Sequence, residues 1–157
     1  MSELPLSARL FMKAYPWRRI DPVPWSPLKK PLNEARVALV STAGLTLPTQ
    51  KPFDDSVKGG DWSYREIPWD ANASEFIDSH RSASYDHSGV YSDANVAFPI
   101  DRIHELAQAG VIGEVNDRHF SLMGSITAPG RLMRHSAPAV ADVLVADGVD
   151  AVLLVPI

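Results

Sequence analysis

Two unbroken apolar runs of strand length stand out in the chain, residues 36–41 (RVALVS) and 151–155 (AVLLV). Runs of this kind are typical of strands that are buried on both faces of a parallel sheet. Residues 119–124 (HFSLMG) predict a third strand, with Phe120 and Leu122 on the same face. The three segments predict the centre of a sheet.

A helix is predicted directly after Pro99, because Ile100, Ile103 and Leu106 recur at the spacing of one helix face. Gly110 follows the last turn, and glycine is the residue type that most often ends a helix. We therefore expect an amphipathic helix that packs one face against the sheet.

A second helix is predicted over about residues 130–147, between the last two predicted strands. Pro138 lies inside this range, so we expect a break, with the main helix starting near Ser136 as its cap. A strand–helix–strand crossover is right-handed and places both strands parallel. The whole pattern predicts an α/β fold over residues 35–157, a three-layer Rossmann-like domain with a mainly parallel sheet.

Residues 1–34 differ in composition and hold six of the chain's 13 prolines. Because proline fixes φ and removes a backbone donor, we expect a proline-rich extended N-terminal arm with one short helix, over Ser7–Tyr15. Trp17, Trp25 and Leu28 are costly to leave in water, which indicates a packed arm and not a disordered linker. Two interpretations stand: the arm wraps its own domain, or it packs on a partner subunit.

Two turns of small residues follow predicted strands, Thr42-Ala43-Gly44 and Gly124-Ser125. Ligands of parallel α/β sheets bind at the carboxyl ends of strands, and the backbone amides of such turns can bind an anion. Thr42, Gly44, Gly124 and Ser125 are therefore candidate substrate-binding residues. Neither turn matches a P-loop or the GxGxxG fingerprint, so a simple tight turn is the alternative at each place.

Residues 45–98 lack a clear period and predict long loops with one or two short strands, and long loops in a small domain often carry function. Within them, His80, Asp86 and His87 are candidate catalytic residues, since such side chains transfer protons near neutral pH. Arg81 is a candidate for binding a substrate carboxylate. The alternatives are a solvated loop and, for Arg81, a surface ion pair. No metal site is assigned, because the spacing matches no established ligand pattern.

The composition narrows the function. The 157 residues include no cysteine, which excludes disulfides, thiolate metal sites and a cysteine nucleophile within this sequence. The net charge is −4 and no run of lysine or arginine is present, so we expect no binding to nucleic acid or to an anionic membrane surface. No signal peptide and no apolar run of about 20 residues is found. We expect a soluble, cytoplasmic protein.

Five segments resemble the selenoprotein B family of glycine, sarcosine, betaine and D-proline reductases, in the order that the family has them. They are Arg36–Gly44 (RVALVSTAG), Gly60–Pro68 (GDWSYREIP), Asn95–Gly113 (NVAFPIDRIHELAQAGVIG), His119–Gly124 (HFSLMG) and Ala151–Pro156 (AVLLVP). The block in residues 95–113 is the most specific of them. The N-terminal YPWR and PVPW sequences look closer to the short family members of the D-proline reductase type.

The resemblance implies thiol-dependent reductive cleavage of the C–N bond of a small amino acid or amine, of the D-proline, glycine or betaine class. In the family, a selenocysteine or cysteine directly follows the strand that matches Ala151–Pro156, and a dithiol donor restores the enzyme. This sequence has no such nucleophile. Either a selenocysteine codon was read as a stop, which leaves the α/β domain incomplete at its C-terminal end, or another subunit completes the site.

The resemblance thus implies a small amino acid or amine as substrate, other reductase subunits as partners and an oligomer, with no cofactor in this chain. An alternative is a non-redox binding or assembly subunit of a multi-subunit complex, joined through the arm and an apolar sheet edge. A weaker alternative is a metal-dependent enzyme that uses His80, Asp86 and His87.

Overall fold

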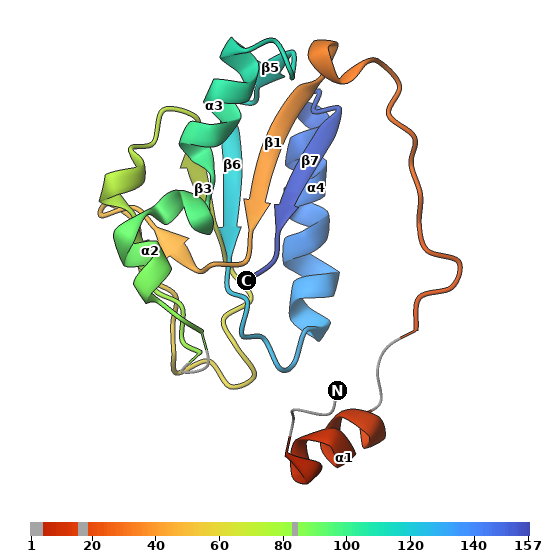
Figure 1. The fold of residues 1–157 in the computed structure, drawn as a ribbon, viewed down its shortest axis with the longest axis vertical. Helices are drawn as coiled ribbons and strands as arrows, with labels where there is room; N and C mark the ends of the chain where they lie inside the picture. The colour runs from red at the N-terminus through yellow and green to blue at the C-terminus, as the bar shows by residue number, and fades with distance from the viewer. Residues whose placement is uncertain (1–4, 16–18, 83–84) are drawn as a thin grey trace.

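The computed structural model describes residues 5–15, 19–82 and 85–157, and its centre is a five-stranded sheet (Figure 1). The strands of this sheet are β1 (Arg36–Ser41), β3 (Tyr64–Pro68), β5 (Glu114–Val115), β6 (Arg118–Leu122) and β7 (Ala151–Val155). β7 pairs in parallel with one edge of β1, and β5 and β6 pair in parallel with the other edge. β3 runs antiparallel beside β6. The predicted mainly parallel sheet is confirmed.

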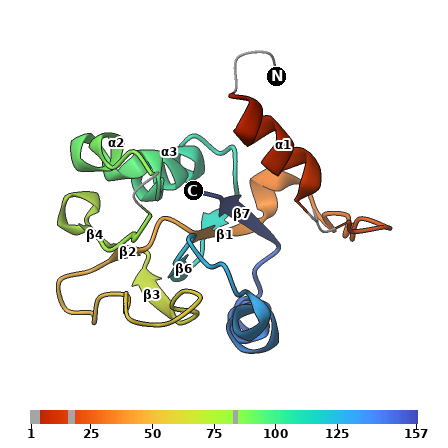
Figure 2. The ribbon, with the colours of Figure 1, turned by 90° about the horizontal axis from the view of Figure 1, so that it is seen from below.

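The α-helices of the described residues are α1 (Leu6–Ala14), α2 (Ser88–Ser92), α3 (Ile100–Gln108) and α4 (Ala137–Ala146). Figure 2 shows α3 on one side of the sheet and α4 on the other. The predicted helix after Pro99 is α3, and Gly110 ends it with a φ of 70°. No helix within the described ranges is long and apolar enough to cross a membrane.

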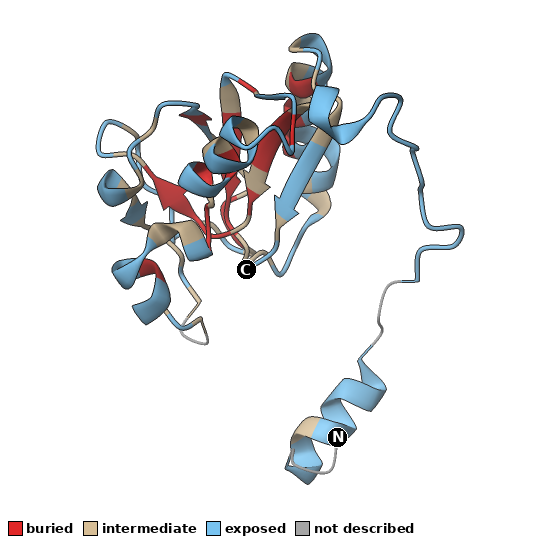
Figure 3. Ribbon diagram, turned by 45° about the horizontal axis from the view of Figure 1, so that its top comes forward, coloured by how far each residue is buried: buried red, intermediate tan, exposed pale blue. Residues whose placement is uncertain are grey.

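The core is built on the two faces of β1 (Figure 3). Val37 and Leu39 pack on one face in a cluster that includes Ile103 of α3, while Ala38 packs on the other with Val140 of α4. Because β1 is buried on both faces, its apolar run correctly predicted a central strand. The mixed α/β class is therefore confirmed, and the Rossmann-like three-layer arrangement stays a prediction.

The last helix begins in two parts. A wide π-helical turn over Leu132–Ser136 leads into α4, and Pro138 lies in the first turn of α4. The helical backbone nevertheless runs without interruption from Gly130 to Ala146, which agrees with the helix predicted over about residues 130–147. The break expected at Pro138 takes the form of this wider turn and not of a new helix start. The predicted capping role of Ser136 is wrong, because its hydroxyl donates to the carbonyl oxygen of Trp62 instead.

The middle third holds more regular structure than its sequence predicts. β2 pairs antiparallel with β4 in a separate two-stranded sheet, and β3 joins the main sheet. The additional elements of this third are β2 (Leu45–Thr46), β4 (Ile77–Asp78) and the 3₁₀ turns Ala73–Glu75 and Ala94–Val96, and a further 3₁₀ turn, Leu32–Glu34, precedes β1. The expectation of one or two short strands was too low, because two-residue strands carry no detectable period.

β7 is an edge strand, and the prediction that it is buried on both faces is wrong. Val152, Leu153 and Leu154 are 37%, 44% and 67% exposed. The reason is topological: β1 covers one edge of β7, and no other strand within the described residues pairs with it. Apolar sequence alone therefore did not distinguish a central strand from an edge strand.

The N-terminal arm leaves the body and runs alone on the side of β7 (Figure 1). α1 confirms the predicted short helix with a shift of one residue. The arm joins the body near its C-terminal end, where Gly113 N donates to Leu32 O (3.1 Å) and Lys30 pairs with Asp150 (2.7 Å). Trp17 lies outside the described residues, and the division of the chain at residue 34 stays a prediction.

Candidate functional site

The carboxyl ends of β1, β6 and β7 meet at one edge of the sheet. Thr42 holds the end of β7 there: its backbone N–H donates to Val155 O (3.1 Å), and its side-chain oxygen accepts from Ile157 N (2.8 Å). Gly44 N donates to Leu122 O (2.8 Å), at the end of β6. Two of the five predicted substrate-binding residues, Thr42 and Gly44, thus hold strand ends together through hydrogen bonds.

His80 lies against this edge. A Cβ atom built on Gly44 would lie 3.2 Å from the Cα atom of His80, and Gly44 has a φ of 66°. A Cβ atom built on Gly124 would lie 2.7 Å from the carbonyl oxygens of both Thr42 and Ile157, and 3.0 Å from Nε2 of His80. Both glycines therefore make room for the imidazole at the end of the sheet.

The His80 imidazole is a hydrogen-bond donor without a partner among the described residues. Nδ1 accepts from the backbone N–H of Ser82 (3.3 Å), so the ring proton of the neutral form lies on Nε2. Nε2 is buried and makes no hydrogen bond. Burial, and secondarily the nearby His87, lower the pKa of His80, while Asp78 raises it. His80 is therefore neutral near pH 7 and presents an N–H toward Gly124.

His87 is partly exposed and pairs with a buried carboxylate. Its Nδ1 shares a hydrogen bond with Oδ2 of Asp78, and the two side chains are 28% and 3% exposed. Oδ1 of the same carboxylate accepts from the backbone N–H of His80 (2.8 Å). The hydrogen bond to Asp78 and the charge of that carboxylate raise the pKa of His87, whereas burial lowers it. His87 therefore holds a proton to a higher pH than an ordinary histidine.

Aromatic rings complete the cluster. The Tyr85 ring lies 4.7 Å from the His80 ring and 4.8 Å from the His87 ring, measured between centroids. The two histidine rings are 6.2 Å apart, and Tyr91 stacks on His87 at 6.1 Å. We call Asp78, His80, Tyr85 and His87 the histidine cluster. It offers a neutral N–H donor and a carboxylate-supported imidazole, which together suit proton transfer.

Asp86, predicted beside the two histidines, belongs to the start of α2 instead. Its Oδ1 accepts from the backbone N–H (3.0 Å) and the hydroxyl (2.7 Å) of Ser88, and these hydrogen bonds lower its pKa. Asp78 takes the place that was expected for Asp86. The sequence signal that was missed is an Asp two residues before His80, a spacing at which its carboxylate binds the backbone N–H of residue i+2.

The other predicted residues lie away from the histidine cluster. The Arg81 side chain is exposed and donates to Val57 O (3.3 Å). The carbonyl oxygen of Ser125 packs close to Gly60, where a Cβ atom would lie 2.9 Å from it. Ala83 and Ser84 lie outside the described residues. Within the part of the chain that the structure covers, no three His, Cys, Asp or Glu side chains are placed to hold a metal ion.

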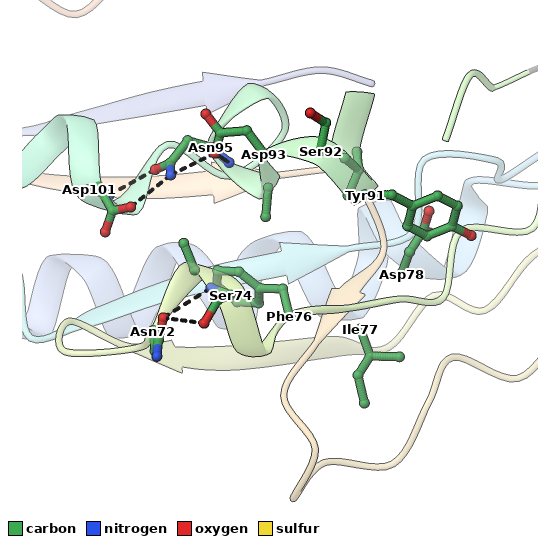
Figure 4. A pocket seen from close by; sticks show the side chains of 13 residues that line it. Asn72, Ser74, Phe76, Ile77, Asp78, Tyr91, Ser92, Asp93, Asn95 and Asp101 are labelled. Carbon is green, nitrogen blue, oxygen red and sulfur yellow. Dashed lines mark hydrogen bonds between the residues drawn. The ribbon is translucent and has the colours of Figure 1, made fainter. Parts of the chain in front are cut away.

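A pocket of about 660 Å³ adjoins the histidine cluster (Figure 4). Asp78 and Tyr91, which both contact His87, form part of its lining. Asp93 and Asp101 also line it, and both accept hydrogen bonds from the Asn95 side chain (2.9 and 2.8 Å). No Lys, Arg or His is among the described residues that line the pocket. Its carboxylates favour a ligand with a positive charge.

Comparison with known proteins shows which family the chain matches in sequence. The family model described as glycine/sarcosine/betaine reductase selenoprotein B matches residues 5–156. The chain is similar to D-proline reductase subunit gamma of Acetoanaerobium sticklandii, with 37% identity over 136 residues, which is 86% of this chain and 54% of the relative. No solved structure matches.

Two further relatives are components of reductase complexes. The gamma subunit of glycine reductase complex component B from Carboxydothermus hydrogenoformans is 29% identical over 92% of this chain and 33% of its own length. The beta subunit of sarcosine reductase complex component B from Peptoclostridium acidaminophilum is 28% identical over 95% of this chain and 34% of its own length. The chain thus spans about half or a third of the length of these relatives.

Proposed function

The chain belongs to the glycine/sarcosine/betaine reductase selenoprotein B family, and from this premise we propose that it is a reductase subunit that takes part in reductive C–N cleavage. The substrate is a small amino acid or amine of the D-proline, glycine or betaine class, and a dithiol supplies the electrons. The observation that carries this proposal is the histidine cluster at the edge where β1, β6 and β7 end.

The soft nucleophile of this reaction comes from polypeptide outside these 157 residues, which contain no cysteine. Its place is beside the end of β7, next to the N–H of His80. A thiolate or selenolate is stabilised where N–H donors converge, so an unpartnered imidazole N–H at a strand end supports this placement. His80 thus orients the nucleophile or the substrate, and donates a hydrogen bond without changing its own charge.

His87 protonates the amine that the cleavage releases. The nucleophile attacks the activated carbon, a carbon–sulfur or carbon–selenium bond forms, and the C–N bond breaks. A nitrogen that enters as an ammonium or quaternary group leaves with the bonding electron pair as a neutral amine, and this amine then takes a proton from the His87 imidazolium. A second thiol then attacks the sulfur or selenium to give a disulfide or selenosulfide, and the released carbon takes a proton. The dithiol donor reduces this bond by thiol–disulfide exchange and is itself oxidised to a disulfide, so it provides both electrons of the cleavage.

The acidic pocket supports the proposal that the substrate is a small amino acid or amine. An ammonium group, or the quaternary nitrogen of a betaine, is attracted by Asp78, Asp93 and Asp101, and no basic side chain in the described lining opposes it. Asp78 connects the two regions, because it lines the pocket and binds His87. The proposal includes no cofactor within this chain, a cytoplasmic location and assembly with other reductase subunits.

A second candidate function is assembly without redox chemistry. The observation that favours it is the exposed apolar surface of the arm and of β7. In that case the chain binds a catalytic partner, and the histidine cluster has a structural role. The two functions differ in whether a change of His87 alters the rate of catalysis.

The test is His87→Gln in the reductase complex that contains this chain, assayed by dithiol-dependent release of amine. Glutamine keeps a hydrogen bond to Asp78 but holds no transferable proton, so we expect kcat to fall about 100-fold with little change in KM. For the wild type, kcat should fall as pH rises through the raised pKa of His87, because the acid form is then lost.

His135→Gln is the matched control, because His135 is exposed and packs beside Trp62 away from the cluster. This variant should keep the wild-type rate. An unchanged kcat and pH profile in His87→Gln would remove the acid role from His87. A wild-type complex that releases no amine from D-proline, glycine or betaine would overturn the proposed reductase function itself.

A further inference from the structure

The arm presents an apolar helix that its own body does not cover. Leu6, Leu10 and Phe11 of α1 are 67%, 58% and 64% exposed, and no residue of this helix is buried. They fall on one broad side of the helix. A helix of nine residues has little stability in water unless it packs on another surface. α1 therefore needs a partner surface, and Figure 1 shows it apart from the sheet.

β7 presents an apolar surface of the complementary kind. Leu153 pairs in register with Leu39 of β1, so both side chains lie on the face that α3 covers farther along the sheet. Leu39 is fully buried, whereas Leu153 is 44% exposed. Other residues therefore cover this face of the sheet at β1 but leave it exposed at β7. An edge strand with exposed leucines is a surface that folded proteins normally cover.

The arm and the body carry net charges of opposite sign. Residues 1–34 contain six basic and three acidic side chains and so carry +3, which leaves −7 for residues 35–157 of a chain with a net charge of −4. One arm cation, Lys30, already binds a body carboxylate, Asp150, next to the start of β7. A basic apolar arm therefore matches an acidic body with an apolar edge.

We propose that two copies of this chain form a dimer by exchanging arms, with α1 of each copy packed on β7 of the other. The two complementary surfaces lie on the same chain, so one contact, repeated about a two-fold axis, covers both arms and both edges. Leu10 and Phe11 pack on Leu153 of the second copy. The basic side chains of α1, Arg9 and Lys13, then lie near the acidic body.

Solution mass and point variants test the dimer. The 157-residue chain should have twice its mass of 17.2 kDa by light scattering. Leu10→Asp and Leu153→Lys should each return the mass to that of one chain while the circular dichroism spectrum is unchanged. Val96→Lys is the matched control, since Val96 is 59% exposed, belongs to the 3₁₀ turn Ala94–Val96 and not to α1 or β7, and should leave the dimer intact.

Engineered cysteines show whether α1 packs on β7 of a second copy or on its own body, since the sequence itself contains no cysteine. Chains with Leu10→Cys and chains with Leu153→Cys are mixed and oxidised, and a disulfide that joins the two kinds of chain supports arm exchange. A double variant that closes its disulfide at the mass of one chain would show that the arm folds back on its own body. That result, a wild-type chain that stays at 17.2 kDa, or a dimer that both variants leave intact, overturns the proposal. These readouts are independent of reductase activity.

Discussion

Gly124 lies where three parts of the candidate site meet, and they can approach so closely because glycine has no Cβ atom. The end of β1 (Thr42), the end of β7 (Ile157) and the His80 imidazole all approach within about 3 Å of the place where a Cβ atom would be. Two of these neighbours are backbone carbonyl oxygens, which move only if a strand end moves. Glycine at this position therefore sets how closely the strand ends and the histidine cluster can meet.

Gly124→Ala should consequently cost about 1–3 kcal/mol of unfolding free energy, because the added methyl group must displace a strand end. Urea unfolding measures this cost. Gly130→Ala is the control: the nearest atoms to its new Cβ belong to the flexible Arg134 side chain at 3.5 Å or more, so its stability should stay within about 0.5 kcal/mol. Equal costs for the two variants would contradict the steric explanation.

His119 gives the fold a dependence on pH. It is fully buried, its Nδ1 accepts from Leu39 N (3.0 Å), and burial lowers its pKa from 6.5 to about 4. Above pH 6.5 the ring is neutral in both states. As pH falls from 6.5 toward 4, the unfolded chain binds a proton that the folded chain does not, so stability falls by up to roughly 3 kcal/mol.

Urea unfolding at pH 7 and pH 4.5 measures this loss. His119→Asn removes the titrating ring and should show a smaller loss between the two pH values, although its stability at pH 7 is lower. A variant whose stability falls as steeply as that of the wild type would show that other groups cause the pH dependence.

The histidine cluster shows what a sequence reveals about single residues. The density of polar side chains in residues 80–87 drew attention to His80 and His87, and the structure places their two rings side by side. The polar density did not identify the carboxylate, because Asp78 and Asp86 are both close to the histidines in sequence. The choice depends on the pairing of β2 with β4, which places Asp78 opposite Leu45 at the start of the cluster. That pairing involves two residues on each strand and leaves no pattern to detect.

At the scale of elements, α4 shows how burial determines what each of two neighbouring residues contributes to the free energy of unfolding. Leu144 is 7% exposed and packs on Ala38 and Phe120, whereas Val145, the next residue, is 77% exposed. Leu144→Ala should cost about 2–4 kcal/mol, through lost burial and a cavity. Val145→Ala should stay within about 0.5 kcal/mol. Thermal or urea unfolding of both variants tests this, and similar costs would contradict the placement of α4.

The elements whose packing could be predicted are those in which the pattern of apolar residues alone indicates which faces are buried. β1 has an unbroken apolar run and α3 has a clear helical period, and each packs where its pattern indicates. β7 has an equally apolar sequence but lies at an edge, because its burial depends on what pairs with its second side. Sequence pattern thus predicts the type of an element better than its place in the sheet.

At the scale of the whole molecule, the arm and β7 both expose apolar side chains, and for each the question is which surface covers them. Each exposes leucines to solvent, and each lies on the side of the body that carries no further strand in the described residues. Neither surface could be judged from the sequence, because whether an apolar side chain is exposed depends on the assembled structure. Exchange of arms between two copies covers both surfaces with one contact.

The opposite charges of arm and body predict that salt weakens the dimer. Arm residues 1–34 carry +3 and the rest carries −7, so each exchanged arm is attracted to the other body. Raising NaCl from about 0.05 to 0.5 M shortens the screening length to a few ångströms and should raise the dimer Kd roughly fivefold to tenfold. Sedimentation equilibrium across this range measures the change. Arg9→Gln/Lys13→Gln should reduce the salt dependence, whereas Lys51→Gln on the body should not, and a Kd that falls with NaCl would indicate an association driven by apolar contacts alone.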